Sequence, residues 1–212
     1  MSNENVIHCV IHCAIPGSIL RAAACFVANP MDVRTYLRDV CVTSKGGTLY
    51  VVATDGGAMA VFSDYRQSLP DFEVLIPPTV IKAIKKASAD ECYLHITPAI
   101  RDPKTFCTTE QAFVTIDAPT GSSQTFRPSD NRYPAFLRVI PGKDGEYEHA
   151  CFDVNLLSRF VDAKKALGAS GPFVGLVEVI PRGQSATRAD IHLEPPYGWE
   201  FIGVITPLNV IR

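Results

Sequence analysis

Two neighbouring stretches decide the fold of this chain: MDVRTYL at residues 31–37 and GTLYVVATDGGAMAV at residues 47–61. The second stretch holds two runs of apolar and β-branched residues, and the turn residues Thr-Asp-Gly-Gly separate them. A further turn signal, Lys-Gly-Gly at residues 45–47, precedes the first run. The pattern predicts three consecutive strands joined by tight turns, at residues 35–44, 48–54 and 58–63.

The same order of elements occurs three times along the chain, with a period of roughly 70 residues. Each unit has a strand, a helix with apolar residues at helical spacing, and then further strands. This repeat predicts an α+β protein with helices on one face of antiparallel sheets. The three units comprise a strand at 6–15, a helix at 18–28 and the strands above; a strand at 72–76, a helix at 79–87 and strands at 92–97, 112–117 and 123–126; and a strand at 148–153, a helix at 155–167 and strands at 173–180, 187–193 and 199–205.

Capping and proline rules give the expected helix boundaries. Ser18 is the predicted N-cap of the first helix, and Asn29-Pro30 should end it, because proline disfavours helical backbone at the residue before it. Pro77-Pro78 is well placed in the first turn of the second helix.

Composition indicates a globular protein without a membrane span. The 212 residues are 47% hydrophobic and 20% charged, and no apolar run approaches the length of about 18 residues that crosses a bilayer. The first residues lack a positive segment followed by an apolar one, so we expect no secretory signal and a cytoplasmic location. The formal net charge of −2 means that any contact with nucleic acid needs a local basic face.

The cysteines predict free thiols rather than a disulfide framework or a metal centre. Their number, seven, is odd, and they stand mostly inside apolar runs, as buried thiols in a reducing compartment do. His8, Cys9, His12 and Cys13 form the densest group of metal-ligand types. On one strand the two histidines face away from the two cysteines, so no four-ligand set converges there. We expect no metal and no cofactor.

Three motifs resemble the middle domain of the bacterial sliding clamp, the β subunit of DNA polymerase III. DVRTYL at residues 32–37 resembles Asp-Val-Arg-Tyr-Tyr-Leu, and ATDG at residues 53–56 matches the start of Ala-Thr-Asp-Gly-His-Arg-Leu-Ala. YPAFLRVIP at residues 133–141 resembles Phe-Pro-Asp-Tyr-x-x-Val-x-Pro, in the same order and spacing. The resemblance implies the DNA clamp fold and a complete clamp-like domain of two units at residues 1–141.

The third unit resembles the second half of the clamp's last domain. FDVNLL at residues 152–157 is similar to the strand-to-helix entry there, and GVITPL at residues 203–208 resembles the terminal Val-Val-Met-Pro-Met. The resemblance therefore implies a shortened clamp, in which residues 142–212 form a half-domain.

In the family, a hydrophobic groove between these two parts takes short linear peptides from polymerases and other replication proteins. The chain departs from the family beside this groove, because Gly57-Ala58 replaces His-Arg and Thr206 replaces the first Met of the terminal motif. The positions that match the groove are Leu37, Thr54, Gly56, Met59, Pro134 and Val139 on one wall, and Pro207 and Leu208 on the other.

Clamp helices line a central hole and contact DNA phosphates through basic side chains, which gives non-specific, salt-dependent affinity. Lysines at i, i+3 and i+4 lie on one face of the second helix, opposite its apolar stripe. The resemblance implies the following candidates for contact with duplex DNA: Arg21, Arg34, Tyr36, Lys82, Lys85, Lys86, Arg159, Lys164 and Lys165.

No enzyme signature competes with this interpretation. No glycine-rich phosphate loop opens a helix, and no G-x-S-x-G elbow is present. His149 and Cys151 alternate faces of one strand, and Asp55 is better explained as a turn-stabilising Asx residue. The sequence thus predicts a processivity factor that tethers polymerase or other partners to double-stranded DNA, as a homo-oligomer. Four chains of three units would supply the twelve units of a full ring. The alternative is a clamp-like adaptor or competitor that binds replication proteins without encircling DNA.

Overall fold

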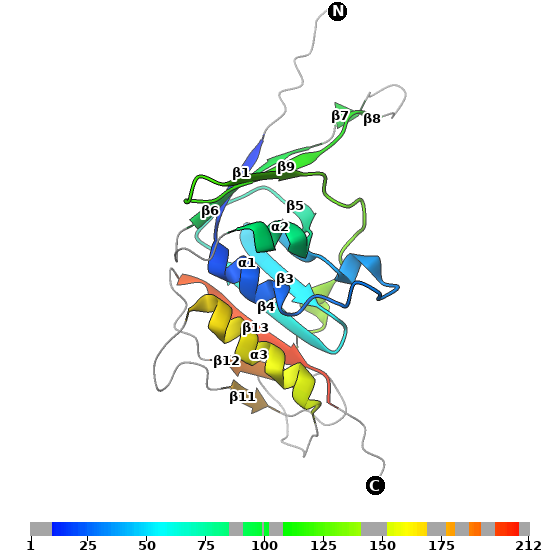
Figure 1. Ribbon diagram of the computed structural model, residues 1–212, viewed down its shortest axis with the longest axis vertical. Helices are drawn as coiled ribbons and strands as arrows, with labels where there is room; N and C mark the ends of the chain where they lie inside the picture. The colour runs from blue at the N-terminus through cyan, green and yellow to red at the C-terminus, as the bar shows by residue number, and fades with distance from the viewer. Residues whose placement is uncertain are drawn as a thin grey trace, which may run out of the picture.

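The computed structural model describes residues 10–84, 91–98, 100–101, 108–140, 152–168, 177–180, 187–191 and 198–207. Its main sheet has seven antiparallel strands in the order β11-β12-β13-β4-β3-β2-β5 (Figure 1). The strands are β2 (Val40–Lys45), β3 (Thr48–Thr54), β4 (Ala58–Asp64), β5 (Phe72–Ile76), β11 (Val177–Ile180), β12 (Thr187–Ile191) and β13 (Glu200–Ile205).

A second antiparallel sheet has four strands in the order β1-β6-β9-β10. The first strand of each of the first two units thus joins the sheet of the other unit: β1 pairs with β6, and β5 pairs with β2. The strands of this sheet are β1 (Ile11–Pro16), β6 (Glu91–Thr97), β9 (Phe113–Asp117) and β10 (Ser123–Phe126), and a small hairpin adds β7 (Ile100–Arg101) and β8 (Thr108–Glu110).

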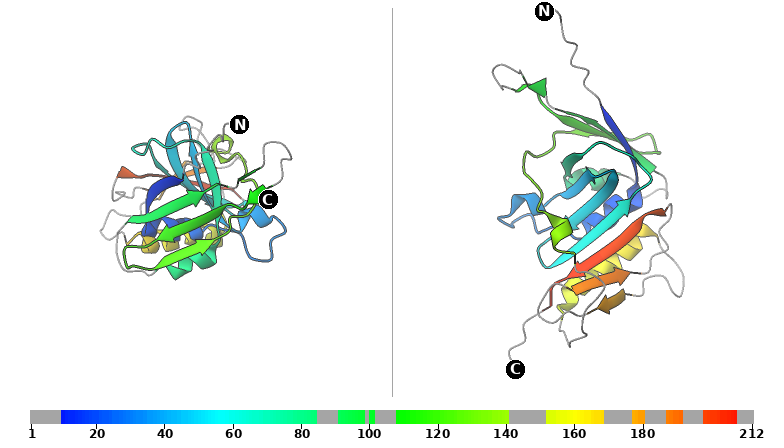
Figure 2. Two further views of the ribbon diagram at one scale, coloured as in Figure 1. Left: turned by 90° about the horizontal axis from the view of Figure 1, so that it is seen from above. Right: turned by 180° about the vertical axis from the view of Figure 1, so that it is seen from behind.

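Three helices lie in a row: α1 (Gly17–Ala24), α2 (Pro78–Ala83) and α3 (Val154–Leu167). α1 and α3 pack on the seven-stranded sheet, and α2 packs beside α1 against β10 of the four-stranded sheet. Figure 1 views this row, and the right panel of Figure 2 shows the strands from the opposite side. The segment after α1 packs on α3, with the rings of Phe26 and Phe160 edge-to-face at 4.9 Å. None of the helices in the described residues is long and apolar enough to cross a membrane.

The third unit extends the sheet of the first. β13 runs antiparallel to β4 from the pair Glu200 and Ser63 to the pair Ile205 and Ala58. Phe62 and Phe201 pack across this junction with their centroids 4.8 Å apart. The two units therefore share one continuous sheet.

The middle strands of the seven-stranded sheet are buried on both faces. On β3, Val51 belongs to the core cluster under the helices, whereas its neighbour Val52 belongs to a second cluster on the other face. On β4, Phe62 belongs to the cluster under the helices and Met59 to the cluster on the other face, because successive side chains of a strand point to opposite faces. The sheet therefore separates the helix layer from a second apolar surface.

The predicted fold class is confirmed, and several strands agree with the sequence prediction to the residue. The strands at 48–54, 72–76 and 123–126 have the predicted bounds. The hairpin turn at Gly46 and Gly47 also forms, with φ of +59° and +82°, as a two-residue turn between strands requires.

Four local predictions were wrong. Thr35–Leu37 forms a short 3-10 helix, η1, rather than a strand, because Leu37 N–H turns back to the carbonyl of Arg34. Ser18 is not a cap, since α1 begins directly after β1 and buries this side chain. The first helix ends at Ala24, well before Asn29-Pro30. The strand at 148–153 does not include Asp153, which instead caps α3 by accepting from Asn155 N–H at 2.8 Å.

The hairpin β7–β8 was not predicted. Parts of five predictions, at residues 6–9, 85–87, 148–151, 173–176 and 192–193, lie outside the described residues.

Candidate functional site

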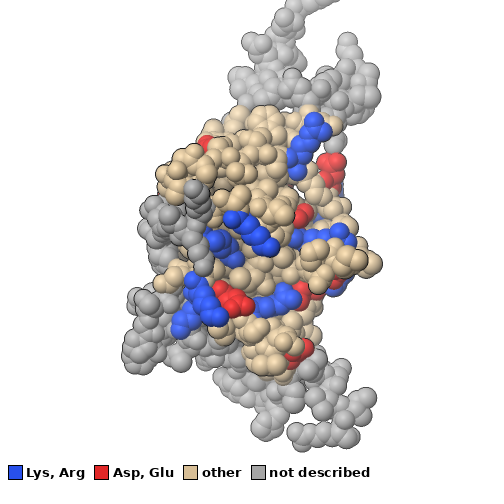
Figure 3. Space-filling model, viewed as in Figure 1, with Lys and Arg blue, Asp and Glu red and all other residues tan. Residues whose placement is uncertain are grey.

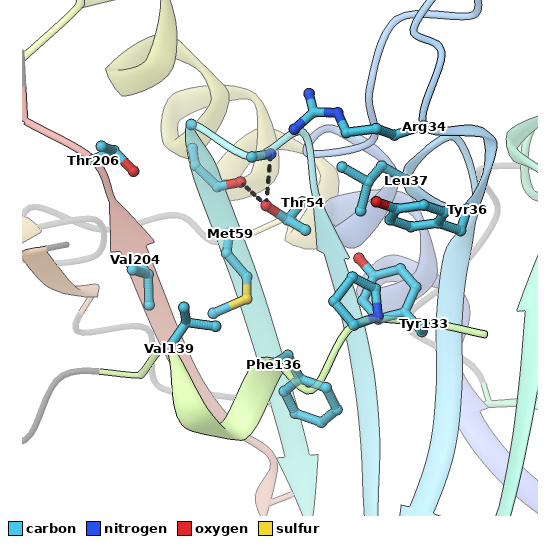
Figure 4. A pocket seen from close by; sticks show the side chains of 14 residues that line it. Arg34, Tyr36, Leu37, Thr54, Met59, Tyr133, Phe136, Val139, Val204 and Thr206 are labelled. Carbon is cyan, nitrogen blue, oxygen red and sulfur yellow. Dashed lines mark hydrogen bonds between the residues drawn. The ribbon is translucent and has the colours of Figure 1, made fainter.

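An apolar pocket of about 250 Å³ lies on the face of the seven-stranded sheet opposite to the helices (Figure 4). It opens where β3 and β4 meet in a turn, beside η1, a second 3-10 helix, η2 (Phe136–Arg138), and the end of β13. Its lining consists of Arg34, Tyr36, Leu37, Thr54, Gly56, Gly57, Ala58, Met59, Tyr133, Pro134, Phe136, Val139, Val204 and Thr206.

The segment around η2 forms one wall and is held by contacts from the sheet below. Tyr133 N–H donates to Glu73 Oε1 at 2.9 Å. The ring of Phe136 packs edge-to-face on Tyr50 at 5.5 Å, with Lys45 Nζ 5.2 Å from the ring centroid. These contacts fix the wall against the strands.

The turn between β3 and β4 forms the rim. Asp55 Oδ1 accepts from Gly57 N–H at 2.8 Å and from Ala58 N–H at 2.9 Å, which confirms its predicted Asx role. Thr54 Oγ1 accepts from Gly56 N–H at 3.0 Å and donates to the Ala58 carbonyl at 2.8 Å. Every backbone donor in the turn after Asp55 is thereby used, which makes the rim rigid.

Arg34 crosses this rim and is held in place by an acidic neighbour. Its Nε and Nη2 donate to the two carboxylate oxygens of Asp32 at 3.0 and 2.8 Å, and Nη2 also donates to the Asp55 carbonyl at 2.9 Å. The side-chain and backbone hydrogen bonds from Arg34 lower the pKa of Asp32 to about 2. Gly56, at φ +91°, leaves the space that the guanidinium fills, since a Cβ there would lie 2.5 Å from Arg34 Nη1.

Tyr133 brings a polar atom to an otherwise apolar wall. The residue is 6% exposed, and burial raises the pKa of its phenol. The hydroxyl forms no hydrogen bond within the described residues.

The third unit closes the pocket through three contacts with the rim. Thr206 N–H donates to the Gly57 carbonyl at 2.8 Å. The side chain of Leu156 fills the space beside Gly57, where an added Cβ would lie 3.2 Å from both Leu156 methyl carbons. Arg159 Nη2 pairs with Asp55 Oδ2 at 2.7 Å. The small residues at 56–58 thus leave room for Leu156 of α3 on one side of the turn, and they line the pocket on the other side.

Six of the eight residues predicted for the groove line this one pocket: Leu37, Thr54, Gly56, Met59, Pro134 and Val139. Pro207 is half-buried but outside the lining, and Leu208 lies outside the described residues. The prediction missed Tyr133, Phe136 and Val204, although these residues stand within the motifs at 133–141 and 203–208. Whether the pocket binds peptides stays a prediction.

The residues predicted to contact DNA fall into three groups. Arg21, Lys82, Lys164 and Lys165 belong to the helix row, and Figure 3 shows Lys and Arg side chains gathered over this face. Arg34 and Tyr36 line the pocket instead, on the other side of the sheet. Lys85 and Lys86 lie outside the described residues.

Arg159 belongs to the helix row but is engaged inside the protein. Besides the ion pair with Asp55, its Nη1 donates to the carbonyls of Cys25 and Val27 at 3.3 and 3.2 Å. Both ends of its guanidinium are therefore used, so we leave Arg159 out of the proposed DNA contacts.

The helix row is more basic than the rest of the chain. The three helices carry five Lys or Arg residues and one acidic residue, Asp162, although the whole chain has a net charge of −2. Lys165 pairs with Asp162 at 3.1 Å on the surface, and Arg21 is half-buried, which lowers its pKa. The remainder of the chain is therefore acidic on balance.

The residues weighed for chemistry give no catalytic arrangement in the described part of the chain. Asp55 is committed to its turn and to Arg159. His149 and Cys151 lie outside the described residues. The four cysteines described, Cys13, Cys25, Cys41 and Cys92, are free thiols, and no group of three or more metal-ligand side chains gathers among the described residues.

Solved structures with the same fold are bacterial sliding clamps. The clamp from Pseudomonas aeruginosa with ligand is 17% identical, with a TM-score of 0.64 over 94% of this chain and 66% of that one. DNA polymerase III subunit beta from Borrelia burgdorferi, in complex with a natural product, is 11% identical, with a TM-score of 0.66 over 100% and 67%. A Pseudomonas aeruginosa clamp bound to griselimycin is 15% identical, with a TM-score of 0.59 over 99% and 68%. No family model and no curated protein matches the sequence.

The chain therefore has the DNA clamp fold, with repeated units, antiparallel sheets and helices on one face. Within that fold it is similar to the β subunit of bacterial DNA polymerase III and spans about two thirds of the length of the clamps it matches. The resemblance in the motifs at 32–37, 53–56 and 133–141 is confirmed at the level of the fold.

Proposed function

We infer that this chain is a non-enzymatic, clamp-like processivity factor of the cytoplasm, which holds partner proteins on double-stranded DNA. The observation that carries the proposal is the separation of two surfaces by one sheet. A basic helix row lies on one face, and an apolar pocket lies on the other. A protein built in this way holds DNA and a partner at the same time without bringing them into contact.

The pocket suits an extended peptide with one or two apolar anchors. Leu37, Met59 and Val204 provide its apolar surface, and burying one Leu or Phe anchor contributes about 1.5–3 kcal/mol. The Pseudomonas aeruginosa clamp with the same fold is a griselimycin complex, which supports ligand binding as a property of such proteins. DNA polymerase peptides are the partners we propose.

The helix row suits DNA phosphates rather than base edges. Lys82 and Lys164 stand on different helices of the row. They are therefore suited to contact different phosphates along the DNA backbone rather than one phosphate group. Contacts of this type are independent of base sequence, and their affinity falls as the salt concentration rises, because cations compete for the phosphates.

The open sheet ends support self-assembly. β10 and β11 are each the last strand of a sheet within the described residues, and an edge strand presents unpaired backbone groups to another chain. We propose a homo-oligomer that closes around DNA, and a tetramer would supply twelve units.

Tethering to DNA is tested by loading the full chain onto a closed circular plasmid and then linearising it. We expect a ring to co-sediment with the circle and to be lost from free ends after cutting. A monomer that is retained equally on both DNA forms would overturn encirclement, and the absence of any retention at low salt would overturn DNA tethering altogether.

Groove binding is tested with peptides selected from a random dodecapeptide display library against the full chain. Val139→Asp places a charge on the pocket lining at a residue that is 53% exposed, so the fold should tolerate it. We expect at least tenfold weaker binding, about 1.4 kcal/mol. Leu137→Asp is the matched control, because Leu137 is 45% exposed on η2, the 3-10 helix that ends just before Val139, but lies outside the lining. Equal affinities for both variants would contradict the groove.

A second candidate function is an adaptor or competitor that uses the pocket without encircling DNA. Its support is the net charge of −2 together with a length about two thirds that of the matched clamps. Peptide binding that responds to Val139→Asp, combined with a monomer that ignores the plasmid, would favour this function over the processivity factor.

A further inference from the structure

Two histidines meet on the outer face of the four-stranded sheet. His12 on β1 and His95 on β6 are directly paired across the strands. Their rings are edge-to-face, with centroids 4.8 Å apart and the two Nδ1 atoms at 2.6 Å. The two Nδ1 atoms face each other, and the distance between them is shorter than the roughly 2.7–3.2 Å of ordinary N–H···O hydrogen bonds.

A carboxylate orients one of these rings. Asp117 Oδ2 on β9 lies 3.0 Å from His95 Nε2, on the side of the ring away from His12. A carboxylate in this position accepts the Nε2 proton and leaves the Nδ1 lone pair facing His12. In metal sites, a carboxylate that accepts a hydrogen bond from the far nitrogen of a histidine fixes the orientation of that ligand in the same way.

We propose that His12 and His95 form a two-ligand site for a divalent transition-metal ion of the zinc, nickel or copper type, with Asp117 as the positioning residue. Neutral imidazole is a preferred ligand of these ions. Because no third candidate ligand joins the group among the described residues, water or a second molecule fills the remaining positions.

The metal needs only a small adjustment of the rings. Two nitrogens at 2.0–2.1 Å from a tetrahedral ion lie about 3.3 Å apart, so the Nδ1 atoms must separate by less than about 1 Å. His12 is exposed and contacts only His95 among the described polar side chains, whereas His95 is half-buried and also paired with Asp117. One fixed and one adaptable ligand suit a site that loads from solution.

The site is independent of the pocket and the helix row. The neighbouring side chains Cys13, Leu94 and Ile96 point the other way, into the core under the helices. An ion held by His12 and His95 therefore ties the N-terminal strand to β6 on the outer surface. It should stabilise the sheet without altering peptide or DNA affinity.

Zinc titration of the full chain by calorimetry tests the proposal, with His12→Gln and His95→Gln compared with the unchanged chain. We expect one binding event that each variant abolishes, and a Zn²⁺-dependent rise in Tm that disappears with it. Asp117→Asn should keep the event but weaken it about tenfold. Tyr93→Gln is the matched control, because Tyr93 is exposed on the same face and is not a ligand.

The difference between variants separates this site from zinc bound to cysteines elsewhere in the chain. An isotherm that His12→Gln and His95→Gln leave unchanged would overturn the proposal, as would a Tm of the unchanged chain that does not respond to zinc. In either case the contact is a hydrogen bond that only links two strands.

Discussion

At the scale of single residues, the rim of the pocket depends on a glycine that no other residue replaces without strain. Gly56 has φ +91°, and its missing side chain leaves room for Arg34. Gly56→Ala should cost about 1–2 kcal/mol for the left-handed backbone, and a further loss should follow as Arg34 leaves the Asp55 carbonyl. Gly121→Ala is the control, since it has φ +80° and no atom within 4 Å of an added Cβ. Equal losses of unfolding free energy in urea would contradict a role for Arg34.

Tyr133 is a residue whose polar atom should be dispensable for stability. Its hydroxyl is buried without a hydrogen bond in the described residues, and a buried polar group without a partner is unfavourable. Tyr133→Phe should therefore leave the free energy of unfolding unchanged or raise it by up to about 1 kcal/mol. Urea denaturation measures this change. A loss larger than 1 kcal/mol would mean that the hydroxyl has a partner in the folded chain.

At the scale of elements, one ion pair joins three parts of the molecule. Arg159 on α3 reaches Asp55 in the β3–β4 turn and the carbonyls after α1. The two side chains are 27% and 16% exposed, so solvent screens the pair only in part. A double-mutant cycle with Asp55→Asn and Arg159→Gln should give a coupling of about 0.5–3 kcal/mol in thermal or urea unfolding. Additive losses would show that the pair is formed but does not couple α3 to the rim.

The elements also show how far sequence reasoning extends. The strands at 48–54 and 58–64 were predictable because glycine turns and β-branched runs are local signals. The contacts of Arg159 with Cys25 and of His12 with His95 were not predictable, because the two residues of each pair are 134 and 83 positions apart in the chain. The place of Arg34 in the pocket was not predictable for the same reason: the resemblance of its segment to the clamp suggested DNA, and only the fold brings it to the Asp55 carbonyl.

At the scale of the whole molecule, basic side chains lie on both sides of the seven-stranded sheet. Comparing the two sides tests which surface binds DNA, through the salt dependence of the affinity. The helix row holds Lys82 and Lys164 on one side, whereas Arg138 lies on η2 beside the pocket on the other. If the row faces DNA, Lys82→Ala and Lys164→Ala should each reduce the slope of log affinity against log salt by about one. Arg138→Ala should leave the slope unchanged, although it removes the same charge.

The comparison separates a DNA face from general electrostatics. A net charge acts on DNA from every side, so it predicts the same loss for all three variants. Phosphate contacts act only where the side chain lies, so they predict a loss confined to the helix row. Fluorescence anisotropy with a labelled duplex between 50 and 200 mM salt measures the slopes. A slope for Arg138→Ala as shallow as that for Lys82→Ala would show that the affinity reflects general electrostatics rather than phosphate contacts of the helix row.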